Sequence, residues 1–310
     1  MTDSYFDTHV HFGQFEDVYY SPHTVIETLA AHNVKGAYLS STTSCMAWND
    51  ENEKEIIITH IKDEFEEAIL CAKKLKFKLY PVYWIIPKRH FENDTFSDVF
   101  SETPYQGLKI HPRAHDWNLK NEKIRDLMDC ACQFAESRKI PIFIHTGYCE
   151  FESPEKFEEW YKNYPSVTFI LLHCKKTDSV KTLFERYTNV LGDISFCSTD
   201  IVDELIKAGF SERLYFGSDF PIMDYLYGKR DNGIGNLTKV YSGLLETWQT
   251  SVYKGYKQDK IEMRGDRAEM SDFPLYLNTV AGGLDCRDQT IGGFSFVVKI
   301  YALPVVEIIG

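Results

Sequence analysis

Two histidines separated by a single residue near the start of the chain carry the clearest chemical signal. His9 and His11 lie in Asp7-Thr-His-Val-His11, where apolar and polar residues alternate. Side chains two residues apart share one face of an extended strand, so both imidazoles would converge on one point. Converging imidazole nitrogens are suited to bind a divalent metal ion. Taken alone, such a pair is more often a chance placement of two half-buried histidines.

Further metal-capable residues each end a short apolar run. They are His145, His173 and Asp219, which end the runs 140–144, 167–172 and 214–218. Runs of this length, bounded by Gly, Pro or polar residues, are typical of strands that are buried on both faces of a parallel sheet. With the first pair, they put a metal-capable residue at the carboxyl end of four separate strands, an arrangement that is hard to obtain by chance.

The order of apolar and amphipathic segments predicts the fold. Strands are predicted over residues 4–11, 34–41, 78–86, 105–111, 140–146, 167–173, 190–196 and 213–219. Helices are predicted over residues 24–33, 51–76, 94–101, 119–138, 154–163, 177–187 and 199–208. Strict alternation implies parallel strands joined by right-handed crossovers, and eight such units close into a (β/α)8 TIM barrel of the α/β class. An open doubly wound sheet is the alternative, but no glycine-rich phosphate loop follows the first strand.

Composition excludes several classes of partner. The chain has 310 residues, with 46 acidic against 34 basic side chains and a net charge of -12. This acidic balance disfavours a nucleic-acid partner, since phosphate neutralisation needs a basic surface. No apolar run approaches the roughly 18 residues that span a membrane, and no signal-peptide core is found near the start. We therefore expect a cytoplasmic protein that acts on a small-molecule substrate, with neither membrane nor nucleic acid as a partner.

The cysteines show no CxxC spacing, and we expect all eight to be reduced thiols in the core. Cys149 and Cys174 each follow a strand that carries a candidate ligand, so they are the two that could line a pocket. The structural interpretation is favoured for both, because a free cysteine mostly behaves as a small buried hydrophobic residue.

Taken together, these motifs resemble those of the amidohydrolase superfamily, particularly its amidohydrolase-related branch, which includes hydrolases, decarboxylases and hydratases. The matching segments, within residues 1 to about 222, are Asp7-Thr-His-Val-His11, Gly107-Leu-Lys-Ile-His-Pro112, Ile144-His-Thr-Gly147, Leu172-His173 and Gly217-Ser-Asp-Phe-Pro221. The resemblance implies that His9, His11, His145 and Asp219 bind a divalent metal. It also implies that Asp219 can act as the base, and that His173 binds metal or assists catalysis.

Three imidazoles with one carboxylate suit Zn²⁺ or another late divalent ion. Such an ion lowers the pKa of a bound water to about 7, and Asp219 could then pass the proton to a leaving group. As a helix N-cap, Asp219 would have only a structural role.

Lys109 and the loop after it leave several roles open. By period two, Lys109 shares a face with His111. In two-metal relatives a carboxylated lysine at this strand bridges the metals. Lys109 could do the same, bind an anionic substrate as an ammonium, or cap the barrel, and we favour a single metal. In the loop, Arg113 could bind a substrate carboxylate and Trp117 could stack on a ring, although both residues could equally be ordinary surface residues.

The resemblance fades after Pro221. We divide the chain into a barrel over residues 1–250, with residues 236–250 as its eighth helix, and an atypical C-terminal extension over residues 251–310. The apolar end of this extension could be a lineage-specific addition, a dimerisation strand or a stretch unrelated to the natural protein, and a homo-oligomer stays open. An apolar strand of this kind must pack somewhere.

The favoured function is a metal-dependent hydrolase that acts on an amide, ester or lactone of a small, carboxylated organic molecule. The alternative is a non-oxidative decarboxylase or hydratase of an aromatic or unsaturated acid that uses the same site. A phosphodiesterase or nuclease is disfavoured by Lys109, where relatives of that kind usually have a glutamate, and by the acidic balance. A barrel with a purely structural metal is disfavoured because structural metal sites are closed, whereas this set of ligands leaves room for solvent.

Overall fold

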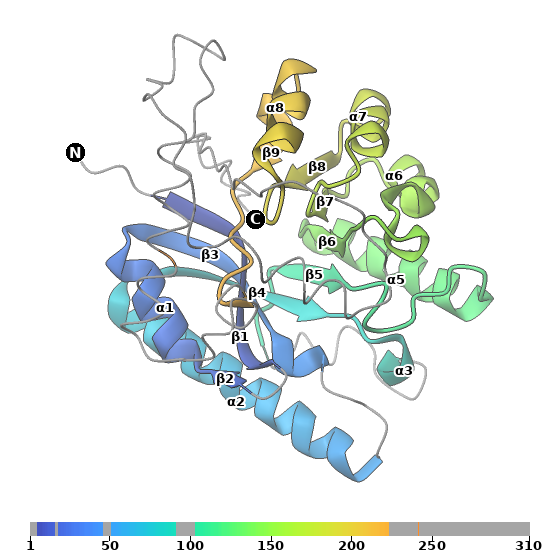
Figure 1. Cartoon of the computed structure of the whole chain (residues 1–310). Coiled ribbons are helices and arrows are strands. Elements are labelled where there is room, and N and C mark those ends of the chain that lie inside the picture. Colours follow the sequence, from blue (N-terminus) through green and yellow to red (C-terminus); the bar gives the residue numbers. More distant parts are fainter. Residues whose placement is uncertain (1–4, 16–17, 46–50, 91–102, 223–240, 242–310) are drawn as a thin grey trace.

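The computed structural model describes residues 5–15, 18–45, 51–90, 103–222 and 241, and its centre is a ring of parallel strands (Figure 1). The parallel strands are β1 (Tyr5–Phe15), β3 (Val34–Ser41), β4 (Lys78–Trp84), β5 (Gly107–Ile110), β6 (Ile142–His145), β7 (Phe169–Leu172), β8 (Val190–Asp193) and β9 (Leu214–Tyr215). They neighbour one another in that order. A short strand, β2 (Val18–Tyr20), adds to β1 in the antiparallel direction.

The segment after β9 returns to β1 and closes the ring. The amide of Thr8 donates to the Phe216 carbonyl at 2.9 Å, and the amide of Asp219 donates to the His9 carbonyl at 2.8 Å. Val10 and Phe220 form a parallel bridge. The (β/α)8 barrel predicted from the sequence is therefore confirmed.

Helices cover the outside of the ring. They are α1 (Pro22–Ala31), α2 (Glu51–Leu75), α3 (Pro87–His90), α5 (Glu122–Arg138), α6 (Glu158–Asn163), α7 (Thr177–Arg186) and α8 (Thr199–Lys207). Ser21, Asn121 and Ser198 each begin a helix by accepting a backbone N–H with the side chain. Within the described ranges, no helix is long and apolar enough to cross a membrane.

The predicted helix over residues 94–101 and the extension over residues 251–310 both lie outside the described residues. Of the predicted eighth helix over residues 236–250, only Tyr241 is described. The predicted helix 154–163 begins instead with a 3-10 turn, Pro154–Phe157, which precedes α6.

Several strands end earlier than the sequence predicts. The predicted strand 213–219 is extended only over Leu214–Tyr215, and the strand predicted to reach His173 ends at Leu172. For β7 the reason is a change of backbone conformation, because φ is +63° at His173, and φ is likewise positive, +53°, at Asp219. Both values lie in the left-handed region, which is incompatible with a strand. The two chemically important side chains therefore lie on the turns that leave the barrel.

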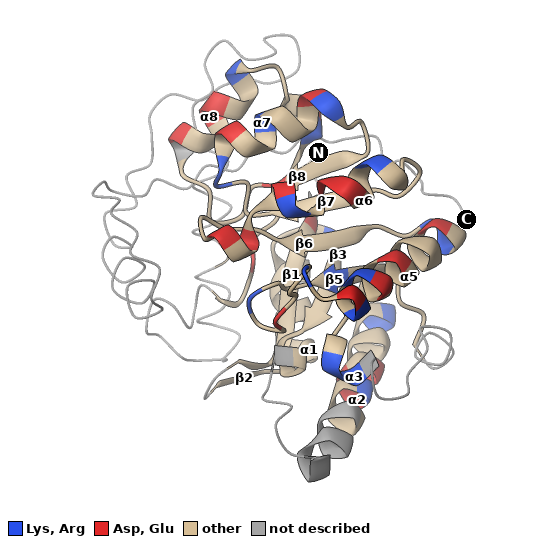
Figure 2. Cartoon of the chain, turned by 90° about the vertical axis from the view of Figure 1, so that its right-hand side faces the viewer, with Lys and Arg blue, Asp and Glu red and all other residues tan. Residues whose placement is uncertain are grey.

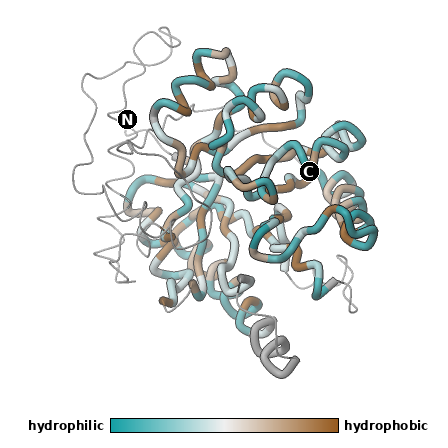
Figure 3. Tube along the Cα trace, turned by 45° about the vertical axis from the view of Figure 1, so that its right-hand side comes forward, coloured by the Kyte–Doolittle hydropathy of each residue, from teal (hydrophilic) through white to brown (hydrophobic). Residues whose placement is uncertain are grey.

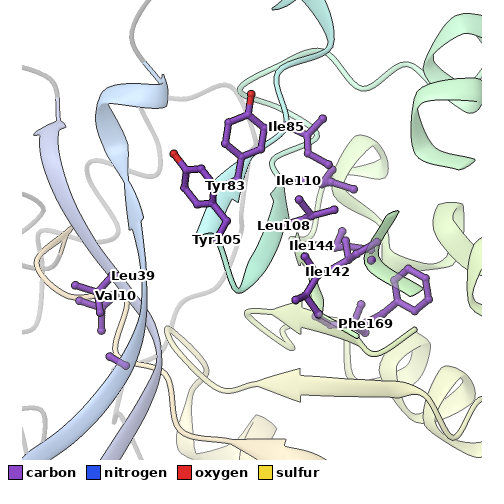
Figure 4. Close-up of a cluster of buried hydrophobic side chains, with 14 of the residues drawn as sticks. Val10, Leu39, Tyr83, Ile85, Tyr105, Leu108, Ile110, Ile142, Ile144 and Phe169 are labelled. Atoms are coloured by element: carbon purple, nitrogen blue, oxygen red, sulfur yellow. The ribbon is translucent and has the colours of Figure 1, made fainter. Parts of the chain in front are cut away.

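Hydrophobic side chains pack on both faces of the ring. Between strands and helices lie Leu108, Ile110, Ile142, Ile144 and Phe169, which Figure 4 shows side by side from adjacent strands. A smaller cluster of Val82, Phe143, Ile170 and Leu172 fills the other face. Figure 3 shows the apolar residues concentrated on the strands, and Figure 2 shows the charged residues on the covering helices. This pattern is typical of a barrel whose interior is a packed core.

Strand register directs one lysine into the barrel. Lys109 aligns with Trp84 on one neighbouring strand and with Phe143 on the other. Aligned residues of a parallel sheet share a face, and Phe143 belongs to the smaller hydrophobic cluster inside the ring. Lys109 therefore points inward, where its side chain is 3% exposed.

The outer packing layer gives a test of the fold. Phe169 is fully buried and its ring lies 4.9 Å from that of Tyr161, so Phe169→Ala should leave a cavity and lower the free energy of unfolding by about 3–5 kcal/mol. Leu70→Ala is the control, because Leu70 is 69% exposed and its loss should change stability by no more than about 0.5 kcal/mol. Urea unfolding measures both, and equal effects of the two substitutions would contradict the described core.

Candidate metal centre

Four side chains converge inside the mouth of the barrel, and we call them the inner cluster: His9 and His11 from β1, His173 from the turn after β7, and Asp219 from the segment after β9. His11 Nε2 lies 3.0 Å from His9 Nε2 and 2.9 Å from Asp219 Oδ1. Asp219 Oδ1 is also 3.3 Å from His9 Nε2, and Asp219 Oδ2 is 3.8 Å from His173 Nε2. All four residues are buried. Nitrogen and oxygen donors from distant parts of the chain thus meet around one centre.

Lys109 enters the same space from β5. Its Nζ lies 3.0 Å from His9 Nε2 and 3.1 Å from His11 Nε2, and 4.5 Å from the centre of the Trp84 ring. A divalent cation bound to these imidazoles would be repelled by an ammonium group at such short range. Lys109 must therefore move away, lose its charge or become carboxylated when a metal binds.

A second group, which we call the outer cluster, consists of His111, His145 and Glu152. Its three ligand atoms lie within 4.8 Å of one another. The His111 and His145 rings stack at 3.8 Å with an angle of 12° between their planes, and His145 Nε2 lies 3.5 Å from Glu152 Oε1. The outer cluster adjoins the inner one, because the His145 and His173 rings are 4.8 Å apart.

Glu152 was missed by the sequence analysis. It ends a short 3-10 helix, Glu150–Glu152, in the loop after β6. One signal was available, the glycine of the His-Thr-Gly segment. A Cβ on Gly147 would lie 2.4 Å from Glu152 Oε2, so a larger residue here would force this carboxylate to shift. Nothing in the sequence alone says which acidic residue lies against this glycine.

The structure distributes the predicted site residues over both clusters. His9, His11 and Asp219 lie together as expected, whereas His145 lies in the outer cluster and His173 takes the place beside Asp219. Arg113 is exposed and close enough to Glu152 for its charge to affect that carboxyl group. Trp117 is 2% exposed and belongs to the hydrophobic core, so the structure lends no support to its stacking on a substrate ring.

Burial sets the protonation of the inner cluster. It lowers the pKa of His9 to about 4 and holds the pKa of His11 and His173 well below the usual range. Burial raises the pKa of Asp219, against the opposing charges of His9 and Lys109. Neutral imidazoles are the form that binds metal, so the three histidines are ready to coordinate at neutral pH.

The outer cluster contains a carboxylate that stays ionised. Burial tends to raise the pKa of Glu152, but a hydrogen bond to His145 and the positive charges nearby outweigh it and lower the pKa. Burial also lowers the pKa of His111 and of His145. A negative carboxylate thus faces two neutral imidazoles at the rim of the site.

The donor set of the inner cluster fits a divalent metal. Imidazole and carboxylate are the ligands of Zn²⁺ and similar ions, and bound histidines usually hold their second ring nitrogen in a hydrogen bond. Here His11 Nδ1 lies 2.9 Å from Ser40 Oγ, and His173 Nδ1 lies 2.8 Å from Ser195 Oγ. The Nε2 atoms of both histidines thereby remain available to bind a metal ion at the centre of the inner cluster.

A disulfide lies in the loop between the outer-cluster ligands. Cys149 is disulfide-bonded and Cys130 is exposed, so the expectation that all cysteines are reduced thiols in the core is wrong for these two residues. Spacing in the sequence does not reveal which cysteines the fold brings together, and for that reason the bond was missed. Cys174 is a free thiol that is fully buried in the core, as the structural interpretation expected.

Comparison of the sequence with family models identifies the protein class. The model of the family described as amidohydrolase matches residues 98–254, just over half of the chain. The chain belongs to the amidohydrolase family. This agrees with the resemblance drawn from the strand-end motifs.

Solved structures share the fold of this amidohydrolase. A crystal structure described as amidohydrolase II has a TM-score of 0.53 at 12% identity, covering 79% of this chain and 93% of the other. A TIM-barrel protein from Bordetella bronchiseptica has a TM-score of 0.50 at 13% identity, covering 78% and 91%. At this identity the likeness shows the barrel alone. No curated protein matches the sequence.

One glycine next to the site gives a second test. A Cβ on Gly217 would lie 1.5 Å from Asp193 Oδ2 and 2.8 Å from the His9 Cβ, which explains the glycine before Ser218-Asp219. Gly217→Ala should therefore displace His9, lower metal affinity at least about tenfold and cost about 1–3 kcal/mol of stability.

Gly209→Ala is the matched control. Its φ of +91° makes alanine unfavourable by about 1–2 kcal/mol, but nothing lies within 4 Å of the added carbon. It should lose stability and keep its metal affinity. Metal titration with a competing chelator measures the difference, and unchanged affinity in Gly217→Ala would refute the described packing around His9.

Proposed function

We propose that this amidohydrolase is a metal-dependent hydrolase that cleaves an amide, ester or lactone of a small, carboxylated organic molecule. The observation that carries the proposal is the convergence of His9, His11 and Asp219, whose donor atoms lie 2.9–3.3 Å apart. These three residues would hold the metal, with His145 at the end of β6 and His173 directly after β7 completing its surroundings. Zn²⁺ is the preferred ion for such a donor set.

A divalent metal bound at this centre would supply Lewis acidity toward a carbonyl oxygen and make water acidic enough to ionise at neutral pH. Asp219 is the residue that moves the proton. Its carboxylate accepts a proton from the attacking water and donates it to the leaving group. Burial raises the pKa of Asp219, which favours its brief protonated state. His173, 3.8 Å from Asp219 Oδ2, orients the carboxylate or the substrate carbonyl.

Positive side chains around the clusters support an anionic substrate. Lys109 lies in the inner cluster, and the charges of Arg113 and Lys175 both act on Glu152. This concentration of cations occurs in a chain whose net charge is -12. Arginine and lysine are the residues that bind carboxylates, so a substrate carboxylate would be held close to the reacting bond.

The alternative function is a non-oxidative decarboxylase or hydratase of an aromatic or unsaturated acid. The position of Lys109, 3.0 Å from His9 Nε2, favours it as a second candidate. If the Lys109 ammonium group moves away from the imidazoles when the metal binds, it could hold a carboxylate next to the metal, where carbon–carbon bond cleavage would release carbon dioxide. The two candidates share a site and differ in which bond of the substrate faces it.

Turnover assays separate these functions. The purified metal-loaded enzyme should open cyclic lactones or cleave amides of carboxylated molecules, and carbon dioxide release from aromatic acids without hydrolysis would favour the alternative. Asp219→Asn should lower kcat by about 10²–10⁴-fold, because the amide cannot accept the proton. Asp126→Asn, an exposed substitution on α5, is the control and should leave kcat unchanged. Full activity in Asp219→Asn would exclude the proposed base.

Metal content tests the role of Lys109. Protein purified without chelator should contain about one metal equivalent per chain if Lys109 remains an amine, and added bicarbonate should then change nothing. An increase to about two equivalents with bicarbonate would instead indicate a carboxylated Lys109 that bridges two ions. Lys109→Met separates the cases, since it cannot be carboxylated. Elemental analysis that finds no metal in either sample would contradict the proposed function.

A further inference from the structure

Ser195 lies beneath the inner cluster, two residues after the end of β8, and its side chain touches both of the neighbouring histidines. Its Oγ is 3.2 Å from His9 Nδ1 and 2.8 Å from His173 Nδ1. The same oxygen donates a short hydrogen bond to Asp193 Oδ1. All these groups are buried, so water does not compete for them.

Counting hydrogens assigns a direction to each contact. A serine hydroxyl has one hydrogen to donate and two lone pairs to accept with. Asp193 Oδ1 acts as an acceptor, because it also receives the backbone amides of Ser195 at 3.0 Å and His173 at 3.2 Å. The hydroxyl hydrogen of Ser195 therefore points to Asp193. Both of its lone pairs remain for N–H donors, which only the two Nδ1 atoms can supply.

We propose that Asp193 and Ser195 fix His9 and His173 in the Nδ1–H tautomer, so that both Nε2 lone pairs face the centre before any metal binds. A neutral imidazole carries its hydrogen on only one nitrogen, and the hydrogen bond of one nitrogen decides the state of the other. The Ser195 hydroxyl prepares His9, and the carbonyl and hydroxyl of Ser195 together prepare His173, so one residue orients two ligands from different parts of the barrel. Ser195 is a positioning residue, and this role rests on the metal site of the proposed function.

The contact of Lys109 on the other side of the His9 ring agrees with this assignment. His9 Nε2 lies 3.0 Å from the Lys109 ammonium, which can only donate, so a lone pair on Nε2 meets a hydrogen from Nζ. With the other tautomer, two N–H groups would face each other at this distance.

Nitrogen NMR of the metal-free protein tests the proposal without any activity. His9 and His173 should both show a protonated Nδ1 and an unprotonated Nε2. In Ser195→Ala, His9 loses the oxygen at its Nδ1 and should show mixed tautomers. His173 keeps the Ser195 carbonyl at 3.0 Å and should stay unchanged, which makes it an internal reference. Ser195→Thr retains the hydroxyl and should restore His9.

Metal affinity gives an independent measurement. Ser195→Ala should weaken metal binding by about 10–100-fold, as loss of hydrogen bonds behind metal ligands typically does. Ser137→Ala, at an exposed position on α5, is the control and should bind like the wild type. Thermal unfolding of the metal-free variants shows whether a loss of affinity merely reflects a loss of stability.

Two results would overturn the proposal. One is a His9 that is protonated at Nε2 in the wild type, a measurement that does not depend on the folding of any variant. The other is an unchanged His9 tautomer in Ser195→Ala. A wild type that shows the expected tautomers but binds no metal would refute the proposed function and leave the tautomer assignment standing. The two failures are thereby distinguishable.

Discussion

The pairing of β1 with the segment after β9 is the interaction on which the site depends, because it joins parts of the chain that are more than 200 residues apart. Asp7 reinforces it from a fully buried position. Its Oδ1 accepts the amides of His9 at 3.1 Å and Ser218 at 3.0 Å, and its Oδ2 accepts the Tyr241 hydroxyl at 2.8 Å. The same contacts that close the barrel therefore bring His9 and Asp219 into one centre.

Around this closure, each reactive side chain is held by groups that take no part in chemistry. His173 and Asp219 adopt left-handed backbone conformations, which cost energy in residues with a side chain. Hydrogen bonds compensate for that cost, since Asp193 accepts the amide of His173 and the His9 carbonyl accepts the amide of Asp219. The loops at the mouth are thus fixed by buried acidic and carbonyl oxygens.

Much of this arrangement follows from the sequence. The alternation of apolar runs and amphipathic stretches predicts the barrel, and period two predicts that Lys109 faces its interior, because both patterns depend on local geometry. The sequence patterns could not predict which ligands surround His145. Whether that ring meets Asp219 or Glu152 depends on a loop conformation, and so does the pairing of Cys149. Residues such as Ser195 and Asp193 carry no motif and become visible only through their contacts.

Lys109 also affects the metal-free protein, through the charge of Asp219. Asp219 is a buried acid, and the charge of Lys109 is among the influences that lower its pKa. An isolated carboxylate in such surroundings would be costly, and a nearby ammonium group reduces that cost. The barrel thus supplies its own counter-ion. A newly made chain can fold before it binds metal, because Lys109 offsets part of the cost of burying the Asp219 carboxylate.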